Sequence, residues 1–133
     1  MPNLGTDNYA VVADIIIPSG SLDSGIVARS NDSFDFTDNL YSAQISTDGS
    51  VYLYSRNNWN WTTLGSYAAG IQVGVTYTLK LVATGSSPVH LEVWLNGTKR
   101  ISYDDSPGYA SGSVGMVNYD PNVKYDNFSV YQQ

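Results

Sequence analysis

Residues 90–103 read HLEVWLNGTKRISY, and this stretch decides the fold. In its first half, the apolar residues Leu91, Val93 and Leu95 alternate with polar or aromatic ones. This alternation is the pattern of a strand that turns one face toward a core. The dipeptide Asn96-Gly97 that follows is typical of a tight turn between antiparallel strands. The stretch therefore predicts a β-hairpin with one apolar face.

The register of this hairpin depends on which face each residue must occupy. A two-residue turn at Asn96-Gly97 would mix apolar and charged side chains on both faces of the hairpin. A three-residue loop that ends at Gly97 instead places Ile101 opposite Leu91 and Arg100 opposite Glu92. We therefore expect the three-residue loop, with the charged pair on the face away from the core.

Composition limits the classes of function. The chain has 133 residues, enough for a single domain over 1–133 that buries its own core. Its net charge of -6 argues against nucleic-acid binding, and it has no membrane-length apolar run. It has no cysteine and one histidine, which excludes a disulfide framework and a histidine-rich metal site. Eleven tyrosines and 3 tryptophans among many small polar residues suit contacts with neutral sugars.

Short alternating stretches recur along the chain, and Gly, Asn and Asp turns separate them. No segment shows sustained helical periodicity. The pattern predicts an all-β sandwich or barrel. Besides the hairpin, the expected strands are residues 9–17, 25–30, 41–46, 51–56, 62–67, 75–82, 113–118 and 124–131.

The order of the strand sequences points to a known family. The series is GIVAR, NLYSAQIS, VYLYSR, GVTYTLKLVATG, LEVWLNGTK, SGSVGMV and YDNFSVY. It resembles the concanavalin A-like, laminin-G-like jelly rolls that occur as carbohydrate-binding modules in bacterial glycan-degrading enzymes. The resemblance covers almost the whole chain. It implies a two-sheet antiparallel β-sandwich, often with a structural calcium, and sugar bound on the concave sheet or its rim loops.

Two tryptophans in an asparagine-rich loop are the sharpest candidates for a sugar site. Trp59 and Trp61 are one residue apart and would point the same way if the loop is extended. Their rings would stack on the apolar faces of sugars, while Asn57, Asn58 and Asn60 would hydrogen-bond to hydroxyls. The alternative is that one tryptophan plugs the end of the sandwich.

Further aromatic residues stand on the faces away from the core. Tyr52, Tyr54 and Arg56 share one face of their strand and lead into the tryptophan loop. On a concave sheet they would extend the sugar site, and Arg56 would grip a diol or a carboxylate through its fork of donors. On a convex sheet they would only shield the backbone. Trp94 also faces away from the core, on the outside of a sheet or the floor of a binding surface.

Arg29 stands beside an acidic loop that contains Asp32, Asp35 and Asp38. This corner is a second candidate sugar contact, or the acids hold calcium. The spacing of the acids is not that of an EF-hand loop. Charged residues are mostly exposed to solvent, so we favour a solvated loop that Arg29 ties down.

A calcium site is also expected near the last strand. Asp126 has the parity of Phe128 and Val130, so a regular strand would point it inward, where an unpaired carboxylate is costly. The resemblance implies a calcium near this end, and Asp14 is a possible second ligand. The alternative is that Asp126 accepts backbone N–H groups at a strand bulge.

Catalysis has little support in the sequence. A glycosidase needs two carboxyls across the scissile bond, but Glu92 is the only glutamate and has no alternate-position acid on its strand. The Glu-x-Asp-x-x-Glu pattern of related glucanases does not occur. The chain has a single histidine, His90, and no cysteine, and no catalytic motif surrounds any serine. The sequence therefore shows no nucleophile–histidine–acid triad.

The sequence thus predicts a non-catalytic, lectin-like module that binds a polysaccharide or oligosaccharide. We expect a monomer that is an accessory domain of a secreted bacterial enzyme and keeps the parent catalytic domain close to its substrate. The alternative is a structural or adhesive β-sandwich domain of a surface protein or tail fibre. A small hydrolase or lyase is a third class.

Overall fold

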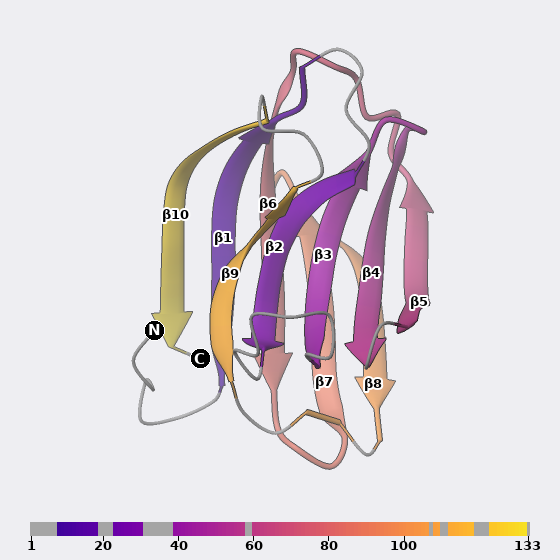
Figure 1. Ribbon diagram of the computed structural model, residues 1–133, viewed down its shortest axis with the longest axis vertical. Helices are drawn as coiled ribbons and strands as arrows, with labels where there is room; N and C mark the ends of the chain where they lie inside the picture. Colours follow the sequence, from indigo (N-terminus) through magenta and orange to yellow (C-terminus); the bar gives the residue numbers. More distant parts are fainter. Residues whose placement is uncertain are drawn as a thin grey trace.

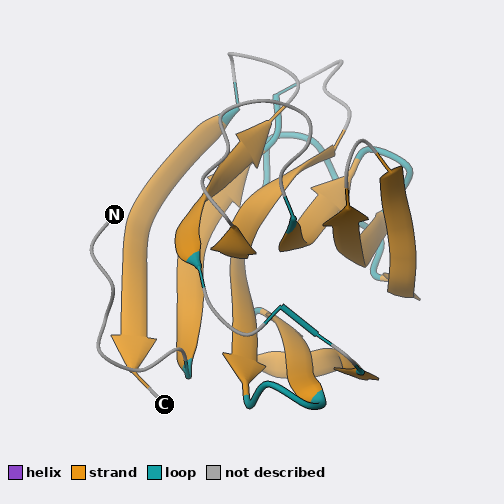
Figure 2. Ribbon diagram, turned by 60° about the horizontal axis from the view of Figure 1, so that its bottom comes forward, coloured by secondary structure: helices purple, strands orange, loops and turns teal. Residues whose placement is uncertain are grey.

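The computed structural model describes residues 8–18, 23–30, 39–57, 60–106, 108–109, 112–118 and 123–132. Within these ranges every regular element is a β-strand (Figure 2), and no helix is long and apolar enough to cross a membrane. The strands form two five-stranded antiparallel sheets (Figure 1). Sheet A has the order β10 (Lys124–Gln132), β1 (Tyr9–Ile16), β6 (Thr76–Thr84), β7 (Val89–Leu95), β8 (Thr98–Asp105). Sheet B has the order β5 (Asn60–Ala68), β4 (Ser50–Asn57), β3 (Leu40–Ser46), β2 (Asp23–Ser30), β9 (Ser113–Asn118).

The core lies between the two sheets and is filled by alternate residues of their strands. Tyr41, Ala43 and Ile45 of β3 are fully buried there, and so are Leu91 and Val93 of β7. Side chains alternate between the two faces of a strand, so the residues between these point away from the core. The predicted two-sheet β-sandwich is confirmed.

The hairpin between β7 and β8 corrects the expected loop. Leu95 pairs with Thr98, so the turn contains only Asn96 and Gly97. Their φ angles of 50° and 84° are both positive, as a type I′ turn requires. The predicted three-residue loop was wrong.

A bulge inside β8, rather than a longer loop, puts Ile101 on the core face of the hairpin. Ile101 pairs with Val93, and the next pair toward the turn skips Arg100. The expected pairing of Ile101 with Leu91 and of Arg100 with Glu92 was therefore wrong. Ile101 is nevertheless buried in the core, because one extra residue restores the parity of the strand.

Candidate functional site

Strands β4 and β5 bring the sequence-predicted aromatic residues onto the outer face of sheet B. Val51 and Leu53 are fully buried, so the alternate residues of β4, Tyr52, Tyr54 and Arg56, point away from the core. On β5, Trp61 pairs with Arg56 and shares its face. The three residues of β4 and Trp61 of β5 thus form one surface across two neighbouring strands.

The three rings on this surface form a continuous strip. The rings of Tyr52 and Tyr54 are stacked, with centroids 5.4 Å apart and planes 19° apart. The ring of Trp61 meets Tyr54 edge-on at 5.6 Å. The guanidinium carbon of Arg56 lies 5.2 Å from the Trp61 ring centroid, a cation–π distance. We call Tyr52, Tyr54 and Trp61 the aromatic strip.

Trp61 is exposed in this arrangement. Its exposed fraction is 37%, and it does not lie in the buried core. The alternative in which Trp61 plugs the sandwich is therefore excluded. Asn60 pairs with Asn57 next to the strip and is exposed, whereas Asn58 and Trp59 lie outside the described residues.

Two carboxylates hold the tyrosines of the strip in place. The hydroxyl of Tyr54 donates to Asp23 Oδ2 at 3.2 Å, reaching from β4 across β3 to β2. The hydroxyl of Tyr52 donates to the Asp48 carboxylate. Burial and the negative charge of Asp23 raise the pKa of Tyr54. The hydrogen bond to Asp48 raises the pKa of Tyr52. The two hydrogen bonds therefore hold both hydroxyl groups in fixed positions.

A polar floor lies on β3, on the same face as the strip. Ser42 pairs with Tyr54 and Gln44 with Tyr52, and both side chains are almost fully buried. The Ser42 hydroxyl donates to the carbonyl oxygen of Ile26 at 2.9 Å, and Gln44 Nε2 donates to Ser42 Oγ at 3.0 Å. These two polar side chains are therefore covered and hydrogen-bonded to each other and to the backbone.

Sequence reasoning missed the residues that support the strip. Asp48 lies four residues before Tyr52, in the turn between β3 and β4. This spacing is a local signal that could have revealed the contact. Asp23 has no such signal, because 31 residues separate it from Tyr54. The order of strands in the sheet brings those two residues together.

Trp94 does not join the strip. It stands on β7, on the outer face of sheet A, whereas the strip belongs to sheet B. Its indole Nε1 donates to Glu92 Oε1 at 2.9 Å, and Lys80 Nζ lies 4.6 Å from its ring centroid. Any sugar contact of Trp94 would therefore belong to a separate surface.

Arg29 lies inside the protein rather than at an open corner. It is 1% exposed, and its Nη1 donates to the carbonyl oxygens of Gly85 at 2.5 Å and Tyr109 at 2.9 Å. Its backbone N–H donates to the Tyr9 hydroxyl at 2.8 Å. These bonds tie β2 to three other parts of the chain. The acidic loop expected beside it, with Asp32, Asp35 and Asp38, lies outside the described residues, and sugar contact by Arg29 stays a prediction.

The structure brings Asp14 and Asp126 together, but not in the core. They face each other across β1 and β10, and Asp126 is exposed, so its expected inward direction was wrong. The physical reason is a bulge at Asn127, whose φ is 52°. The backbone N–H of Asn127 donates to Asp126 Oδ1 at 2.8 Å, which confirms the bulge alternative.

The pair does not fit a closed calcium site. Calcium takes six to eight oxygen ligands, whereas this pair offers two carboxylates. Both oxygens of Asp14 already accept hydrogen bonds, from the Thr78 hydroxyl at 2.6 Å and from Asn127 Nδ2 at 2.7 Å. These bonds lower the pKa of Asp14. No cluster of three potential metal ligands occurs within the described part of the chain.

The fold has solved counterparts. Carbohydrate binding module CBM66 from Bacillus subtilis has a TM-score of 0.77 at 20% identity, over 94% of this chain and 75% of that one. Galectin LEC-6 from Caenorhabditis elegans has a TM-score of 0.68 at 16% identity, over 96% and 84%. A GH43 protein from Bacillus licheniformis has a TM-score of 0.61 at 15% identity, over 96% and 28%.

At these identities the likeness shows the fold, and it confirms the expected concanavalin A-like jelly roll. The sequence matches no family model and no curated protein.

Proposed function

We propose that this chain is a non-catalytic carbohydrate-binding module that binds a polysaccharide on the outer face of sheet B. The observation that carries the proposal is the aromatic strip, whose three rings are contiguous and bordered by Arg56. Sugar C–H groups would pack on the exposed faces of the rings. Arg56 and Asn60 would donate hydrogen bonds to hydroxyls at the end of the strip.

The strip is suited to binding because its side chains are already held. The bonds of Tyr52 to Asp48 and of Tyr54 to Asp23 restrict the rings before a ligand arrives. A surface that is ordered in advance loses less side-chain entropy on binding. On the neighbouring strand β3, the residues paired with Tyr54 and Tyr52 are the buried Ser42 and Gln44.

The carboxylates next to the strip hold tyrosine side chains in place, which argues against a role in hydrolysis. Asp23 and Asp48 each accept a tyrosine hydroxyl, so neither is placed as a free acid or base. A glycosidase requires two carboxyls on either side of the scissile bond. The proposed role is therefore binding without chemistry.

The proposal includes a role for this chain as an accessory domain within a larger enzyme. Two of the solved structures with this fold are called a carbohydrate binding module and a galectin, and a third is called a GH43 protein of which the alignment covers 28%. The first and third names support the part of the proposal in which this chain is an accessory domain beside a catalytic partner in its parent chain. We propose in addition that it is secreted and monomeric. In that setting the module would raise the local concentration of enzyme on a polymeric substrate.

The test is a binding titration of the wild type and two tryptophan variants against neutral and anionic polysaccharides. We expect saturable binding to one glycan class. Trp61→Ala should weaken it about tenfold or more, because losing an exposed aromatic anchor typically costs over about 1.4 kcal/mol. Trp94→Ala is the matched control, since its ring lies on the other sheet.

Two results would contradict the proposal. Equal losses in the Trp61 and Trp94 variants would show that the strip is not the site. No binding of any glycan by the folded wild type would favour the structural or adhesive alternative.

A further inference from the structure

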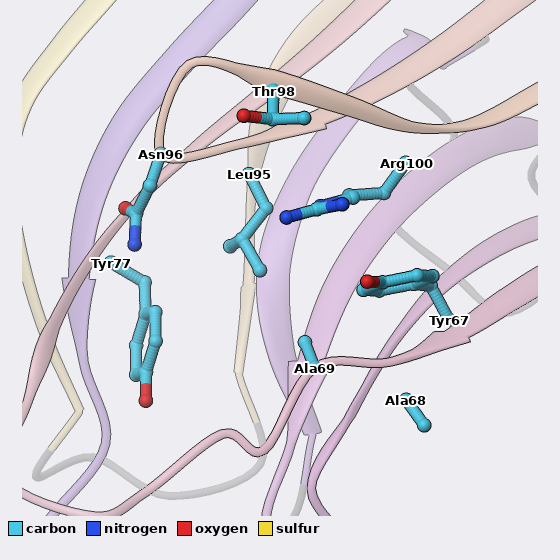
Figure 3. A pocket seen from close by; sticks show the side chains of 8 residues that line it. All are labelled: Tyr67, Ala68, Ala69, Tyr77, Leu95, Asn96, Thr98 and Arg100. Atoms are coloured by element: carbon cyan, nitrogen blue, oxygen red, sulfur yellow. The ribbon is translucent and has the colours of Figure 1, made fainter.

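A pocket lies at the edge of the sandwich, away from the aromatic strip. It is a pocket of about 340 Å³ where β5 and β8, the edge strands of the two sheets, come together (Figure 3). Its size is at the lower end of the range for small-molecule sites, about 300–1,000 Å³. Tyr67, Ala69, Tyr77, Leu95, Asn96 and Arg100 are among the residues that line it.

The pocket is separate from the strip because it opens on the other side of β5. Tyr67 pairs with Val51, which is fully buried, so the Tyr67 ring is on the inter-sheet side of β5. Trp61 pairs with Arg56 on the outer side. The strand itself therefore stands between the two sites.

The two irregular features of the β7–β8 hairpin supply the polar groups of the pocket. Arg100 is the extra residue of the β8 bulge, and its guanidinium carbon lies 4.7 Å from the Tyr67 ring centroid. Asn96 occupies the turn, where its Oδ1 accepts a hydrogen bond from the Thr78 N–H at 2.9 Å. That bond leaves the Nδ2 donors of Asn96 for a ligand, and Figure 3 shows both side chains among the lining residues.

The charge of Arg100 has no counterion in the part of the chain that the structure describes. The ion pairs found there involve His90, Glu92, Lys99 and Asp104, whereas Arg100 lies over the neutral ring of Tyr67. This is notable in a chain with 12 acidic and 6 basic residues. A guanidinium fixed over a ring in a concave site presents its donors to a planar anion such as a carboxylate.

We infer that this edge pocket binds a single sugar unit that carries a carboxylate, that is, a uronic acid. Arg100 binds the carboxylate, the amide of Asn96 donates to a ring or hydroxyl oxygen, and the Tyr67 and Tyr77 rings with Leu95 contact the sugar's C–H groups. The site does not depend on the aromatic strip or on the function proposed for it.

The test follows backbone amide NMR signals during titration with glucuronate, and in parallel with glucose and acetate. Glucose lacks the carboxylate, and acetate lacks the ring. We expect glucuronate to shift the signals of Tyr67 and residues 96–100 saturably, with at least about tenfold weaker responses to glucose and acetate.

Three variants locate the effect. Arg100→Gln should weaken glucuronate binding about tenfold or more, because a charge-assisted bond is lost. Lys124→Gln removes the same charge from the exposed far edge, on β10, and should leave binding unchanged. Trp61→Ala should also leave it unchanged, which separates this site from the strip.

The inference is overturned if saturating glucuronate shifts no pocket signal, or if glucose binds equally well. It is also overturned if Arg100→Gln binds as the wild type does. Should Arg100→Gln fail to fold, Asn96→Asp decides the matter, since aspartate tolerates the positive φ of the turn and adds a repelling charge. Unchanged glucuronate binding by that variant would likewise overturn the inference.

Discussion

At the scale of the residue, the pairing of Asp14 with Asp126 across β1 and β10 has the sharpest consequence. Like charges directly opposite each other on antiparallel strands destabilise a sheet. Because Asp126 is exposed, water and salt weaken this repulsion. We therefore expect Asp126→Asn to raise the melting temperature slightly in EDTA, while keeping the acceptor for the Asn127 N–H.

Added calcium distinguishes repulsion from ion binding at the same pair. If the pair holds calcium, the ion will raise the melting temperature of the wild type and not that of Asp126→Asn. If calcium moves neither protein, or both alike, the pair is not its site. A lower melting temperature for the variant in EDTA would contradict the repulsion argument itself.

At the scale of the element, the outer face of the β7–β8 hairpin carries a histidine between two acids. His90 Nδ1 lies 2.6 Å from Asp104 Oδ1, and Nε2 lies 2.9 Å from Glu92 Oε2. The imidazole can donate from both nitrogens only when it is protonated. These hydrogen bonds, first to Asp104 and then to Glu92, raise the pKa of His90 above 6.5.

This arrangement predicts a pH-dependent stability. A pKa raised by folding means that the contribution is complete below the unfolded pKa of 6.5 and is lost as the pH rises through the folded value. The His90 side chain is 40% exposed, so we expect less than about 1 kcal/mol. The measurement is chemical denaturation of the wild type and His90→Gln on both sides of this transition.

The variant is a clean control because the chain has a single histidine. The advantage of the wild type should shrink as the pH rises. An advantage that stays constant, or an imidazole that titrates by NMR at or below 6.5, would contradict the prediction.

At the scale of the whole molecule, a glycine lets the two sheets meet at one edge, where β5 packs against β8. A Cβ added to Gly65 on β5 would lie 2.6 Å from Cγ2 of Ile101 on β8, inside any permitted contact. Cγ2 belongs to a β-branched side chain that moves little. Gly65→Ala should therefore push the edge strands apart and cost about 1–3 kcal/mol of unfolding free energy.

Gly115 on β9 provides the matched control, because a Cβ there would meet nothing within 4 Å. Gly115→Ala should be nearly neutral in the same denaturation experiment. Equal stabilities of the two variants would show that the edge is not closed by this contact. Gly65→Ala should also change the edge pocket more than the aromatic strip, since only the pocket lies between the sheets.

The sequence by itself determined the features that depend on alternation within one strand. The period-2 pattern predicted the sandwich and placed Tyr52, Tyr54 and Arg56 on one outward face. It also marked Ile101 as a core residue. These inferences hold because the direction of a side chain within a regular strand follows from local backbone geometry.

Only the tertiary structure decided what depends on contacts between distant strands. The bulges at Arg100 and Asn127 each add one residue to a strand, which reverses the face to which the following side chains point. The first bulge changed the expected register of the hairpin, and the second turned Asp126 outward. The order of strands put Trp94 on the opposite sheet from Trp61 and brought Asp23 to Tyr54. A bulge or a strand neighbour is selected by the packing of the whole sheet, and the residues on either side of it carry no unambiguous local signal.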